Sequence, residues 1–378
     1  MAATLPFRYG FPVIRVRHVT DRLSARGGAD WHLLGVIRSQ IEAWGADAVR
    51  LAVGQVDGTV PAPPCPVEVV PGLEARVRAP VDPGPLLGPA ALIHVHNVVN
   101  PAALERLVRA GRPVVATVQD HRSFCPGRGK WTAADEVCRE PFGPARCAGC
   151  FGASEKERRY LAAMLELTRD RLAALREVSA VTVLSRYMKR ELVTAGLAAE
   201  RVHVIPPFVH GLEDGEAEAG PPCALFVGRL VEAKGPLDAV EAWRRSGLDL
   251  PLVLAGTGSA RERISERAPE VELCGWVPHE RLAGLYRRAR LLLMPCRWQE
   301  PFGIVGLEAL SRGVPVAAWD SGGVREWHPG PGLAPWGDVD ALARAAREVV
   351  GGATPPPRGF ERDALMDRLH ALYLAVAP

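Results

Sequence analysis

Apolar residues along this chain fall into two alternating patterns. Short runs of consecutive apolar residues have the length of buried strands, and longer stretches repeat apolar residues with the spacing of an amphipathic helix. We expect strands over residues 11–18, 46–56, 67–70, 91–97, 113–118, 180–184, 202–205, 224–227, 252–255, 291–295 and 314–318. The clearest expected helices cover residues 155–178, 338–350 and 361–376. Strands that alternate with helices in this way are typical of α/β proteins.

The chain is long enough for two domains. Its 378 residues exceed the usual size of a single domain. Pro206-Pro207 and the acidic, glycine-containing stretch after it predict a linker over residues 207–222. We therefore expect one domain over residues 1–206, a second over residues 223–356, and a terminal helix within residues 357–378.

The composition is that of an ordinary globular protein. Hydrophobic residues make up 48% and charged residues 24%, and the net charge of +3 is too small to indicate nucleic-acid binding. No apolar run reaches the roughly 18 residues that a membrane span needs. Arg8, Arg15 and Arg17 interrupt any apolar core of a signal peptide. We therefore expect a cytoplasmic protein whose cysteines are reduced or metal-bound.

The stretch EPFGIVGLE, from Glu300 to Glu308, carries the clearest chemistry. It follows an apolar run and predicts a loop that opens into a helix entered near Phe302. Glu300 would then stay in the loop, while Glu308 would lie about a turn and a half inside the helix. The first-turn amides of Gly303 and Ile304 would favour an anion such as a phosphate. Two solvated glutamates around an ordinary helix start are the alternative.

This stretch resembles the Glu-x7-Glu signature of the family 4 retaining glycosyltransferases. The resemblance is strong over residues 223–327 and weaker, though continuous, over the N-terminal half. It implies the GT-B fold, in which two facing Rossmann-like, doubly wound domains are joined by a C-terminal helix that crosses back to the first domain. It also implies transfer of a sugar from a nucleotide-sugar. Glu300 would then position sugar hydroxyls and Glu308 ribose hydroxyls, with Phe302, Gly303 and Ile304 beside the donor.

Two cations precede this stretch in the second expected domain. Arg229 and Lys234 follow a predicted strand, and two such cations on one loop can hold a diphosphate and stabilise its charge as it leaves. Exposed surface cations are the alternative. The pair matches the phosphate-binding residues of the family, which makes Arg229, Lys234 and Glu300 the expected catalytic residues. The resemblance also implies that three further residues border the nucleotide: Gly256, Gly258 and Val277.

The first expected domain offers weaker candidates. Gly28 lies in a Gly-Gly loop after the first strand, where the family brings backbone close to the donor, and a flexible turn is the alternative. His96 ends a buried strand, where open α/β sheets place ligands, although a satisfied buried histidine is the commoner outcome. Another strand ends in Gln119-Asp120-His121, and Gln119 takes a position where the family frequently has histidine. We expect His96, Gln119, Asp120 and His121 on the acceptor side.

Four cysteines fall in an insertion rich in proline and glycine, over residues 122–152. Cys125, Cys138, Cys147 and Cys150 have the spacing C-x12-C-x8-C-x2-C, and four thiolates can hold a tetrahedral zinc ion. Such an ion would be structural, because four thiolates leave no open position for catalysis. Free thiols and a disulfide are the alternatives. A subset of the resembling family carries a similar cysteine-bearing insertion.

The sequence leaves the substrates open. The resemblance implies a UDP-, GDP- or ADP-sugar donor, and no paired acidic motif suits a catalytic divalent metal, so we expect none. The acceptor could be a glycan, a lipid-linked molecule or a small molecule, and the arginines of residues 155–178 leave a peripheral membrane contact open. Two other functions remain: a donor-binding relative without transfer activity, indicated by Gln119, and a protein that interacts through the cysteine insertion.

Overall fold

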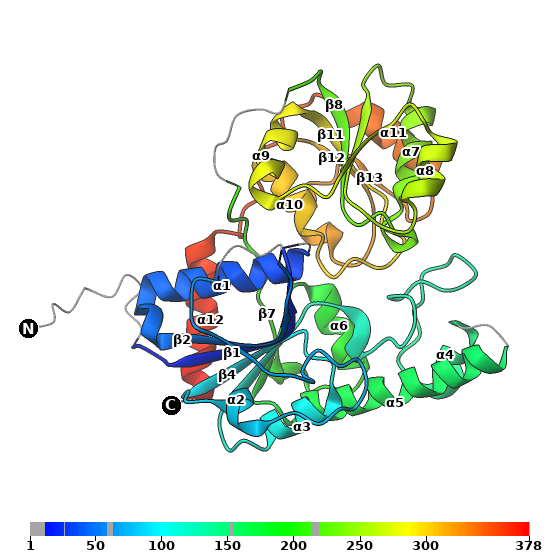
Figure 1. Ribbon diagram of the computed structural model, residues 1–378. Helices are drawn as coiled ribbons and strands as arrows, with labels where there is room; N and C mark the ends of the chain where they lie inside the picture. The colour runs from blue at the N-terminus through cyan, green and yellow to red at the C-terminus, as the bar shows by residue number, and fades with distance from the viewer. Residues whose placement is uncertain (1–11, 26, 59–62, 151–153, 213–218, 378) are drawn as a thin grey trace, which may run out of the picture. The chain divides into compact units, whose positions relative to one another are not determined.

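The computed structural model describes residues 12–25, 27–58, 63–150, 154–212 and 219–377. The chain forms two compact units (Figure 1). Unit 1 combines residues 1–127, 140–208 and 361–378, and unit 2 combines residues 128–139 and 209–360. Part of the expected linker, residues 213–218, lies outside the described residues.

Unit 1 is built on a parallel sheet of seven strands in the order β3-β2-β1-β4-β5-β6-β7. Parallel neighbours need a crossover connection, which intervening helices provide except between β2 and β3, where the described residues of the connection contain no helix. The order runs outward in both directions from β1 and β4, as in a doubly wound Rossmann sheet. The strands of unit 1 are β1 (Val16–Leu23), β2 (Val49–Val56), β3 (Val67–Val69), β4 (Leu92–His96), β5 (Val114–Val118), β6 (Ala180–Val183) and β7 (Val202–Val204).

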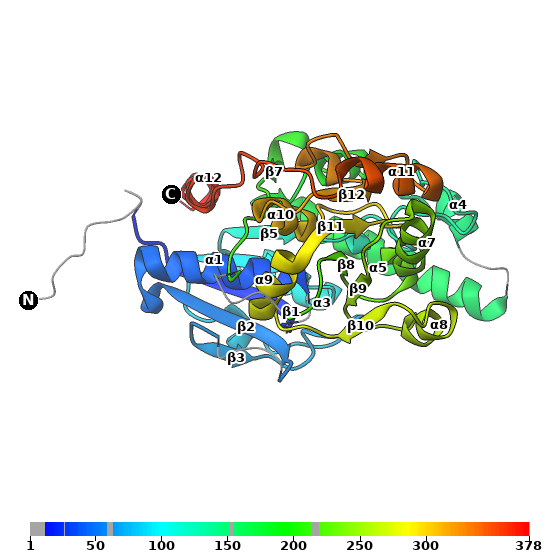
Figure 2. The ribbon, with the colours of Figure 1, turned by 90° about the horizontal axis from the view of Figure 1, so that it is seen from above.

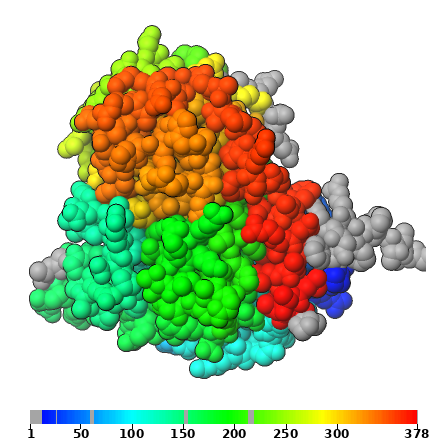
Figure 3. Space-filling model, turned by 180° about the vertical axis from the view of Figure 1, so that it is seen from behind, coloured from blue at the N-terminus to red at the C-terminus, as the bar shows by residue number. Residues whose placement is uncertain are grey.

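Helices cover both faces of this sheet. Apolar residues of α1 and α12 pack on one face, and those of α3, α5 and α6 pack on the other. Figure 3 shows the red C-terminal segment beside the green segment that carries β7, and Arg368 of α12 donates a hydrogen bond to the carbonyl of Val204. The helices of unit 1 are α1 (Gly28–Trp44), α2 (Pro83–Leu87), α3 (Pro101–Val108), α4 (Pro144–Cys147), α5 (Glu155–Glu177), α6 (Arg186–Thr194) and α12 (Arg362–Val376), with 3₁₀ turns η1 (Ala46–Ala48), η2 (His121–Ser123), η3 (Ala148–Cys150) and η4 (Ala199–Arg201).

Local signals fix where two of these helices begin. Ser154 and Glu157 form a reciprocal capping box at the start of α5. Ser185 accepts a hydrogen bond from the Met188 amide and thereby caps α6.

Unit 2 contains a second parallel sheet, in the order β10-β9-β8-β11-β12-β13. Figure 2 shows β10, β9, β8 and β11 following one another across this sheet. Its strands are β8 (Cys223–Val227), β9 (Leu252–Ala255), β10 (Glu272–Gly275), β11 (Ala289–Met294), β12 (Val316–Trp319) and β13 (Leu333–Ala334).

The sheet of unit 2 is also covered by helices. Apolar residues of α7, α8 and α11 form a core cluster with β8, β9, β11 and β12. Helix α9 contacts β8, and α10 contacts β11 and β12. The helices of unit 2 are α7 (Pro236–Ser246), α8 (Arg261–Arg267), α9 (His279–Arg288), α10 (Ile304–Ser311) and α11 (Val339–Val349), with 3₁₀ turns η5 (Glu232–Lys234) and η6 (Val324–Glu326).

The predicted α/β class with two doubly wound parallel sheets is confirmed, and details of the predicted boundaries differ. The first strand begins at Val16 rather than at residue 11, and a 3₁₀ turn precedes β2. Residues 128–139 of the insertion pack with unit 2, although the whole insertion was expected in the first domain. Among the described residues, no helix is long and apolar enough to cross a membrane.

Candidate active site

The Glu300–Glu308 stretch connects β11 to α10 at the carboxyl edge of the second sheet. Helix α10 begins at Ile304, two residues later than expected, because Gly303 caps it in the left-handed conformation (φ 87°). Glu300 is 4% exposed and Glu308 is 6% exposed. The alternative of two solvated glutamates is therefore wrong, because both carboxylates lie inside unit 2.

Glu300 is held through one carboxylate oxygen. Its Oε1 accepts hydrogen bonds from Trp298 Nε1 (2.7 Å) and Cys296 Sγ (3.0 Å), and it pairs with Lys234 Nζ. The backbone N–H of Glu300 donates to Ser321 Oγ at 3.1 Å. Burial raises the pKa of Glu300, but the charge of Lys234 and the three side-chain hydrogen bonds outweigh burial and leave the pKa below its usual value. Glu300 is therefore an ionised carboxylate in a buried position.

Glu308 is held by two side chains of α9. The hydroxyl of Tyr286 donates to Glu308 Oε2 at 2.8 Å, and His279 Nε2 lies 3.3 Å from Glu308 Oε1. Burial, with the adjacent carboxylate second, raises the pKa of Tyr286 well above its usual value, so the phenol keeps its proton. The carboxylate of Glu308 thus has a fixed orientation and the character of a hydrogen-bond acceptor.

The two predicted cations lie on the loop that follows β8. Arg229 Cζ lies 5.7 Å and Lys234 Nζ 4.4 Å from the centre of the Trp298 ring. Trp298 is also a hydrogen-bond partner of Glu300. The structure therefore brings the three predicted catalytic residues, Arg229, Lys234 and Glu300, around one indole within unit 2.

Backbone contacts hold the cation-bearing loop against the loop of Glu300. The amides of residues 297 and 298 donate to the carbonyl of Ala233 at 3.0 and 3.2 Å. Gly235 has φ 67°, and a Cβ there would lie 1.9 Å from the carbonyl oxygen of Pro295. Only glycine permits this approach, which places Lys234 beside Glu300.

Gly256 and Gly258 are required by packing between neighbouring loops. A Cβ at Gly256 would lie 1.8 Å from the carbonyl oxygen of Gly228, and one at Gly258 would lie 2.3 Å from that of Leu230. The loops after β8 and β9 therefore touch along their backbones at the carboxyl edge of the sheet. Val277 is half-buried just beyond β10. The expected contacts of Gly256, Gly258 and Val277 with a nucleotide stay predictions.

Phe302 anchors the loop by packing. The residue is 2% exposed, and its ring meets that of Phe360 edge to face at 5.6 Å between centroids. Trp327 Nε1 donates to the Phe302 carbonyl at 2.5 Å. Because the Phe302 side chain is enclosed, a donor could be contacted here through the backbone of Gly303 and Ile304.

The candidates of unit 1 cluster at the carboxyl ends of β4 and β5. Gln119 is 6% exposed, and neither its Nε2 nor its Oε1 has a hydrogen-bond partner among the described residues. Asp120 accepts from the amide and the guanidinium of Arg122, at 2.8 and 2.6 Å. Burial raises the pKa of Asp120, but Arg122 outweighs it and keeps the pKa below its usual value. His121 Nε2 lies 3.2 Å from the hydroxyl of Tyr187.

Two candidates of unit 1 need correction or refinement. His96 is fully buried, with Nε2 3.1 Å from Nδ1 of His18. It is enclosed in unit 1, which favours the alternative of a buried histidine, and its expected place on the acceptor side stays a prediction. Gly28 is the first residue of α1 and is exposed, after an N-cap at Gly27 in ordinary extended conformation.

Sequence reasoning missed a buried polar network under α1 and α12. Its histidines share one face of the sheet, because His94 and His96 are two residues apart on β4 and His18 pairs with His94. We call this set the buried histidine network; it comprises His18, Gln40, His94, His96, Thr117, Thr182 and Tyr373.

The hydrogen bonds of the network assign a proton to each ring. His18 Nε2 lies 2.7 Å from Gln40 Oε1, so His18 donates there and accepts from His96 at Nδ1. The Gln40 amide donates to the Tyr373 hydroxyl at 3.3 Å, and that hydroxyl then donates to His94 Nδ1. His94 Nε2 in turn donates to Thr117 at 2.6 Å. All three rings are therefore neutral.

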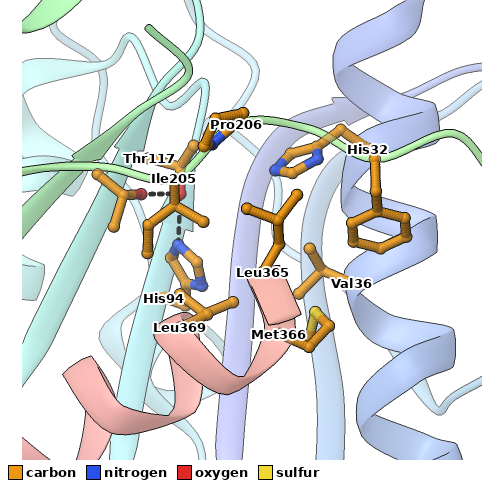
Figure 4. A pocket seen from close by; sticks show the side chains of 11 residues that line it. His32, Val36, His94, Thr117, Ile205, Pro206, Leu365, Met366 and Leu369 are labelled. Atoms are coloured by element: carbon orange, nitrogen blue, oxygen red, sulfur yellow. Dashed lines mark hydrogen bonds between the residues drawn. The ribbon is translucent and has the colours of Figure 1, made fainter. Parts of the chain in front are cut away.

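A small cavity lies beside this network (Figure 4). Figure 4 shows His94 bonded to Thr117, with Val36 of α1 and Leu365, Met366 and Leu369 of α12 around them. The cavity has about 10 Å³, which is room for about one water molecule. Ring nitrogens of His18, His94 and His96 lie within 4.8 Å of one another and form the one group in the described residues that could share a metal ion. Hydrogen bonds engage both ring nitrogens of His18 and of His94, and Nε2 of His96.

The structure does not gather the four cysteines of the insertion. Cys138 belongs to unit 2, while Cys125, Cys147 and Cys150 belong to unit 1. Within the described part of the chain, they do not form a group of three or more ligands close enough for one ion. The zinc site stays a prediction without support from the geometry, and we derive no step through it.

Three site residues were missed although the sequence held a signal for them. Tyr286 and His279 are seven residues apart, two helical turns, so both face Glu308 from α9. Trp298 lies between Arg297 and Glu300 in the sequence. An aromatic residue close to charged residues in this loop could have been predicted as part of the site. What the sequence could not show is that its ring would meet cations from another loop.

Two family models match the chain over adjoining stretches. The model described as glycosyl transferases group 1 matches residues 213–350, and the model described as Glycosyltransferase Family 4 matches residues 86–210. The first covers the motif residues of unit 2 described above. The second ends at residue 210, close to Val209, where the longer segment of unit 2 begins.

Curated relatives match parts or most of the chain. A glycogen synthase of Mycobacterium tuberculosis is 34% identical over 144 residues, which is 35% of this chain and 34% of that protein. The chain thus spans about a third of the length of this relative. D-inositol 3-phosphate glycosyltransferase 1 of Catenulispora acidiphila is 29% identical over 375 residues, covering 86% of this chain and 82% of that protein.

A solved structure matches nearly the whole fold. Anabaena HepE, crystallised with UDP and glucose, superposes with a TM-score of 0.65 at 17% identity, covering 96% of this chain and 99% of HepE. At that identity the likeness concerns the fold, which is GT-B. The two family models place this chain among the family 4-like glycosyltransferases, and the solved structure shows that its fold is GT-B.

Proposed function

We propose that this protein is a retaining glycosyltransferase that moves a sugar from a nucleotide-sugar to an acceptor. The observation that carries the proposal is the convergence of Arg229, Lys234 and Glu300 around Trp298, with Glu308 fixed on the adjoining helix. A surface with unrelated charges would not bury the Glu300 carboxylate beside Lys234, because burying a charge is costly unless it is paired.

Arg229 and Lys234 are proposed to bind the donor diphosphate. Both are permanent or near-permanent cations, and charge-assisted hydrogen bonds to phosphate are about twice as strong as neutral ones. The negative charge on the phosphate increases as the sugar leaves, so these cations stabilise the transition state more than the ground state. The free amides at the start of α10, near Gly303 and Ile304, would add to this stabilisation.

The two carboxylates are proposed to bind hydroxyl groups of the donor. Glu300 accepts all of its side-chain hydrogen bonds at Oε1 among the described residues, which leaves Oε2 for a sugar hydroxyl. Glu308, held by Tyr286 and His279, would accept from the ribose. These contacts fix the sugar for attack, and positioning of this kind contributes much of the rate enhancement of enzymes.

The chemistry proposed for the reacting groups is inferred from the family. The acceptor hydroxyl attacks the sugar on the face from which the diphosphate leaves, and the leaving phosphate oxygen takes the acceptor proton. The anomeric C–O bond to phosphate breaks, and the new glycosidic bond forms on the same face. No protein nucleophile is required, and we expect transfer to proceed in the presence of a metal chelator.

Gln119 of unit 1 is proposed to contact a substrate hydroxyl. Its amide is buried yet lacks a partner among the described residues. An unpaired buried amide costs about 1–3 kcal/mol, and a bound ligand would relieve that cost.

Thermal shifts against UDP-, GDP- and ADP-sugars test this proposal. A donor at about 100 times its Kd stabilises the folded protein by about 2.7 kcal/mol. Lys234→Ala removes a charge-assisted contact and should weaken binding about 10- to 100-fold, which lowers the stabilisation at the same donor concentration to about 0.4–1.4 kcal/mol. Lys156→Ala, at an exposed position of α5, is the matched control and should keep the full shift.

Release of nucleoside diphosphate with a panel of acceptors is measured on the same preparations. A donor that binds and turns over in the wild type but not in Lys234→Ala supports the transferase. A folded wild-type protein that shows no shift with any nucleotide-sugar contradicts it.

A further inference from the structure

Trp298 lies at the centre of the residues that carry the proposed function, but that function gives its side chain no task of its own. It is half-buried in the loop after β11, two residues before Glu300. Its indole N–H donates to Glu300 Oε1 at 2.7 Å. The centre of the same ring lies 4.4 Å from Lys234 Nζ and 5.7 Å from Arg229 Cζ.

The ring holds two cations without neutralising them. A cation above an indole is attracted by the negative face of the ring, with an interaction that grows when water is excluded. A carboxylate in the same place would bind the cations more tightly, but it would also cancel the charge that a diphosphate needs. The indole therefore helps to hold Arg229 and Lys234 without adding a negative charge to the one that Glu300 already places beside Lys234.

The indole N–H has a second role at Glu300. In the structure Lys234 pairs with Glu300 Oε1, and Trp298 donates to the same oxygen. When Lys234 turns to a diphosphate, Glu300 loses this partner but keeps the hydrogen bonds from Trp298 and Cys296. The carboxylate can then stay in place, with Oε2 directed to the ligand, after its cation has been recruited.

The backbone around Trp298 is fixed independently of the indole. Its N–H donates to the Ala233 carbonyl at 3.2 Å, and its carbonyl accepts from Ser321 Oγ at 2.9 Å. The Glu300 amide donates to the same Ser321 hydroxyl. Substitution of the half-exposed side chain should thus leave the loop in place.

We propose that Trp298 is a positioning residue of the donor site, whose ring holds Arg229 and Lys234 for the diphosphate and whose N–H holds Glu300 for the sugar. The inference rests on the proposed function, because it assigns work to residues that bind the donor. It goes beyond that function by dividing the two tasks between two parts of one side chain, which two substitutions can separate.

Trp298→Phe keeps an aromatic face and removes the N–H. Loss of a hydrogen bond to a charged group should lower kcat about 10- to 100-fold, with the affinity for the nucleoside diphosphate alone within about threefold of wild type. Trp298→Leu also removes the ring, and the lost cation–π contacts should weaken nucleoside diphosphate binding about 3- to 30-fold. The measurements are kcat and donor KM, and calorimetric titration with UDP, GDP and ADP.

Trp243 provides matched controls. It lies on α7 of the same unit, half-buried, with its indole N–H bonded to the Leu250 carbonyl at 2.8 Å. Trp243→Phe and Trp243→Leu should change thermal stability. Neither variant should lower kcat while the affinity for nucleoside diphosphate stays at the wild-type value. Melting temperatures of all four variants show whether each is folded.

The outcomes distinguish this inference from the proposed function. The inference is supported if Trp298→Phe lowers only kcat, while Trp298→Leu lowers both kcat and the affinity for nucleoside diphosphate. Wild-type kinetics in both Trp298 variants, or losses that follow melting temperature as in the Trp243 variants, overturn it. A wild-type protein that binds no nucleotide would instead overturn the proposed function itself.

Discussion

A side chain at position 306 would collide with the ring of Trp327. A Cβ built on Gly306 lies 1.9 Å from that ring, which is 3% exposed and tied by its N–H to the Phe302 carbonyl. Gly306 is helical, so its conformation alone would accept alanine. The glycine within the Glu300–Glu308 motif is thus required by close packing behind the site.

Gly306→Ala should therefore destabilise unit 2. Alanine favours a helix by about 1 kcal/mol, but forcing an atom into a packed core costs about 1–3 kcal/mol or more. We expect net destabilisation, with lower donor affinity because α10 carries Glu308. Urea unfolding followed by tryptophan fluorescence measures it. Ser311→Ala, at the exposed end of α10, is the control, and equal stability of the two variants would refute the packing argument.

Helix α12 is attached to unit 1 by polar as well as apolar contacts. Tyr373 is fully buried and meets His94 and Gln40, while Leu365, Met366 and Leu369 pack on the sheet. Burial lowers the pKa of His18 from 6.5 to about 4, against a smaller opposite effect of its bond to Gln40. Burial also lowers the pKa values of His94 and His96.

Unit 1 should lose stability as the pH falls from about 6.5 to about 4. Above this pH range the rings are neutral in both the folded and the unfolded chain, so protonation takes nothing from the free energy of unfolding. Within it the unfolded chain binds protons that the folded chain excludes, and a shift from 6.5 to about 4 at His18 corresponds to about 3 kcal/mol. Amide hydrogen exchange of β4 and α12 across this range measures the loss.

Substitution of single histidines tests the origin of that loss. His18→Gln should reduce the steepness of the pH dependence, although the variant is less stable at neutral pH. His203→Gln, on the partly exposed end strand β7, should leave most of the pH dependence of stability unchanged. If the protection factors of β4 and α12, which correct for the pH dependence of intrinsic exchange, are equal at pH 4.5 and pH 7.5, the network does not control their stability.

The sequence predicted elements better than it predicted their contacts. The strand, loop and helix around Glu300 follow from local apolar patterns and a glycine, so their order could be predicted, with an error of two residues at Ile304. The burial of His96 and the contacts of Trp298 depend on neighbours from distant segments. The alternation of β4 could have placed His94 and His96 on one face, but not the ring of His18 opposite them.

At the scale of the whole molecule, residues 128–139 link the insertion to unit 2. Trp131 is 2% exposed, with Arg128 Cζ at 4.0 Å and Arg297 Cζ at 5.7 Å from its ring. Arg128 pairs with Glu232 at 2.9 Å, and the Gln299 amide donates to the Gly129 carbonyl at 2.9 Å. This segment therefore supports the two loops that carry Lys234 and Glu300.

Trp131→Ala should loosen those loops. Removal of a buried tryptophan costs about 3–5 kcal/mol, and here the loss should appear as faster amide exchange over residues 295–303 and weaker donor binding. Trp44→Ala, in unit 1 beside His370, is the control and should leave exchange in those residues unchanged. Unchanged exchange in Trp131→Ala would show that the segment does not support the site.

The division of the chain constrains how relatives can be recombined. The chain passes between units after Gly127, Arg139, Phe208 and Phe360. A chimera joined only near residue 208, the natural choice from the sequence, would pair α12 and the Trp131 segment with foreign partners. Exchange of unit 2 to alter donor preference should therefore carry residues 128–139 with it and leave residues 361–378 with their own sheet.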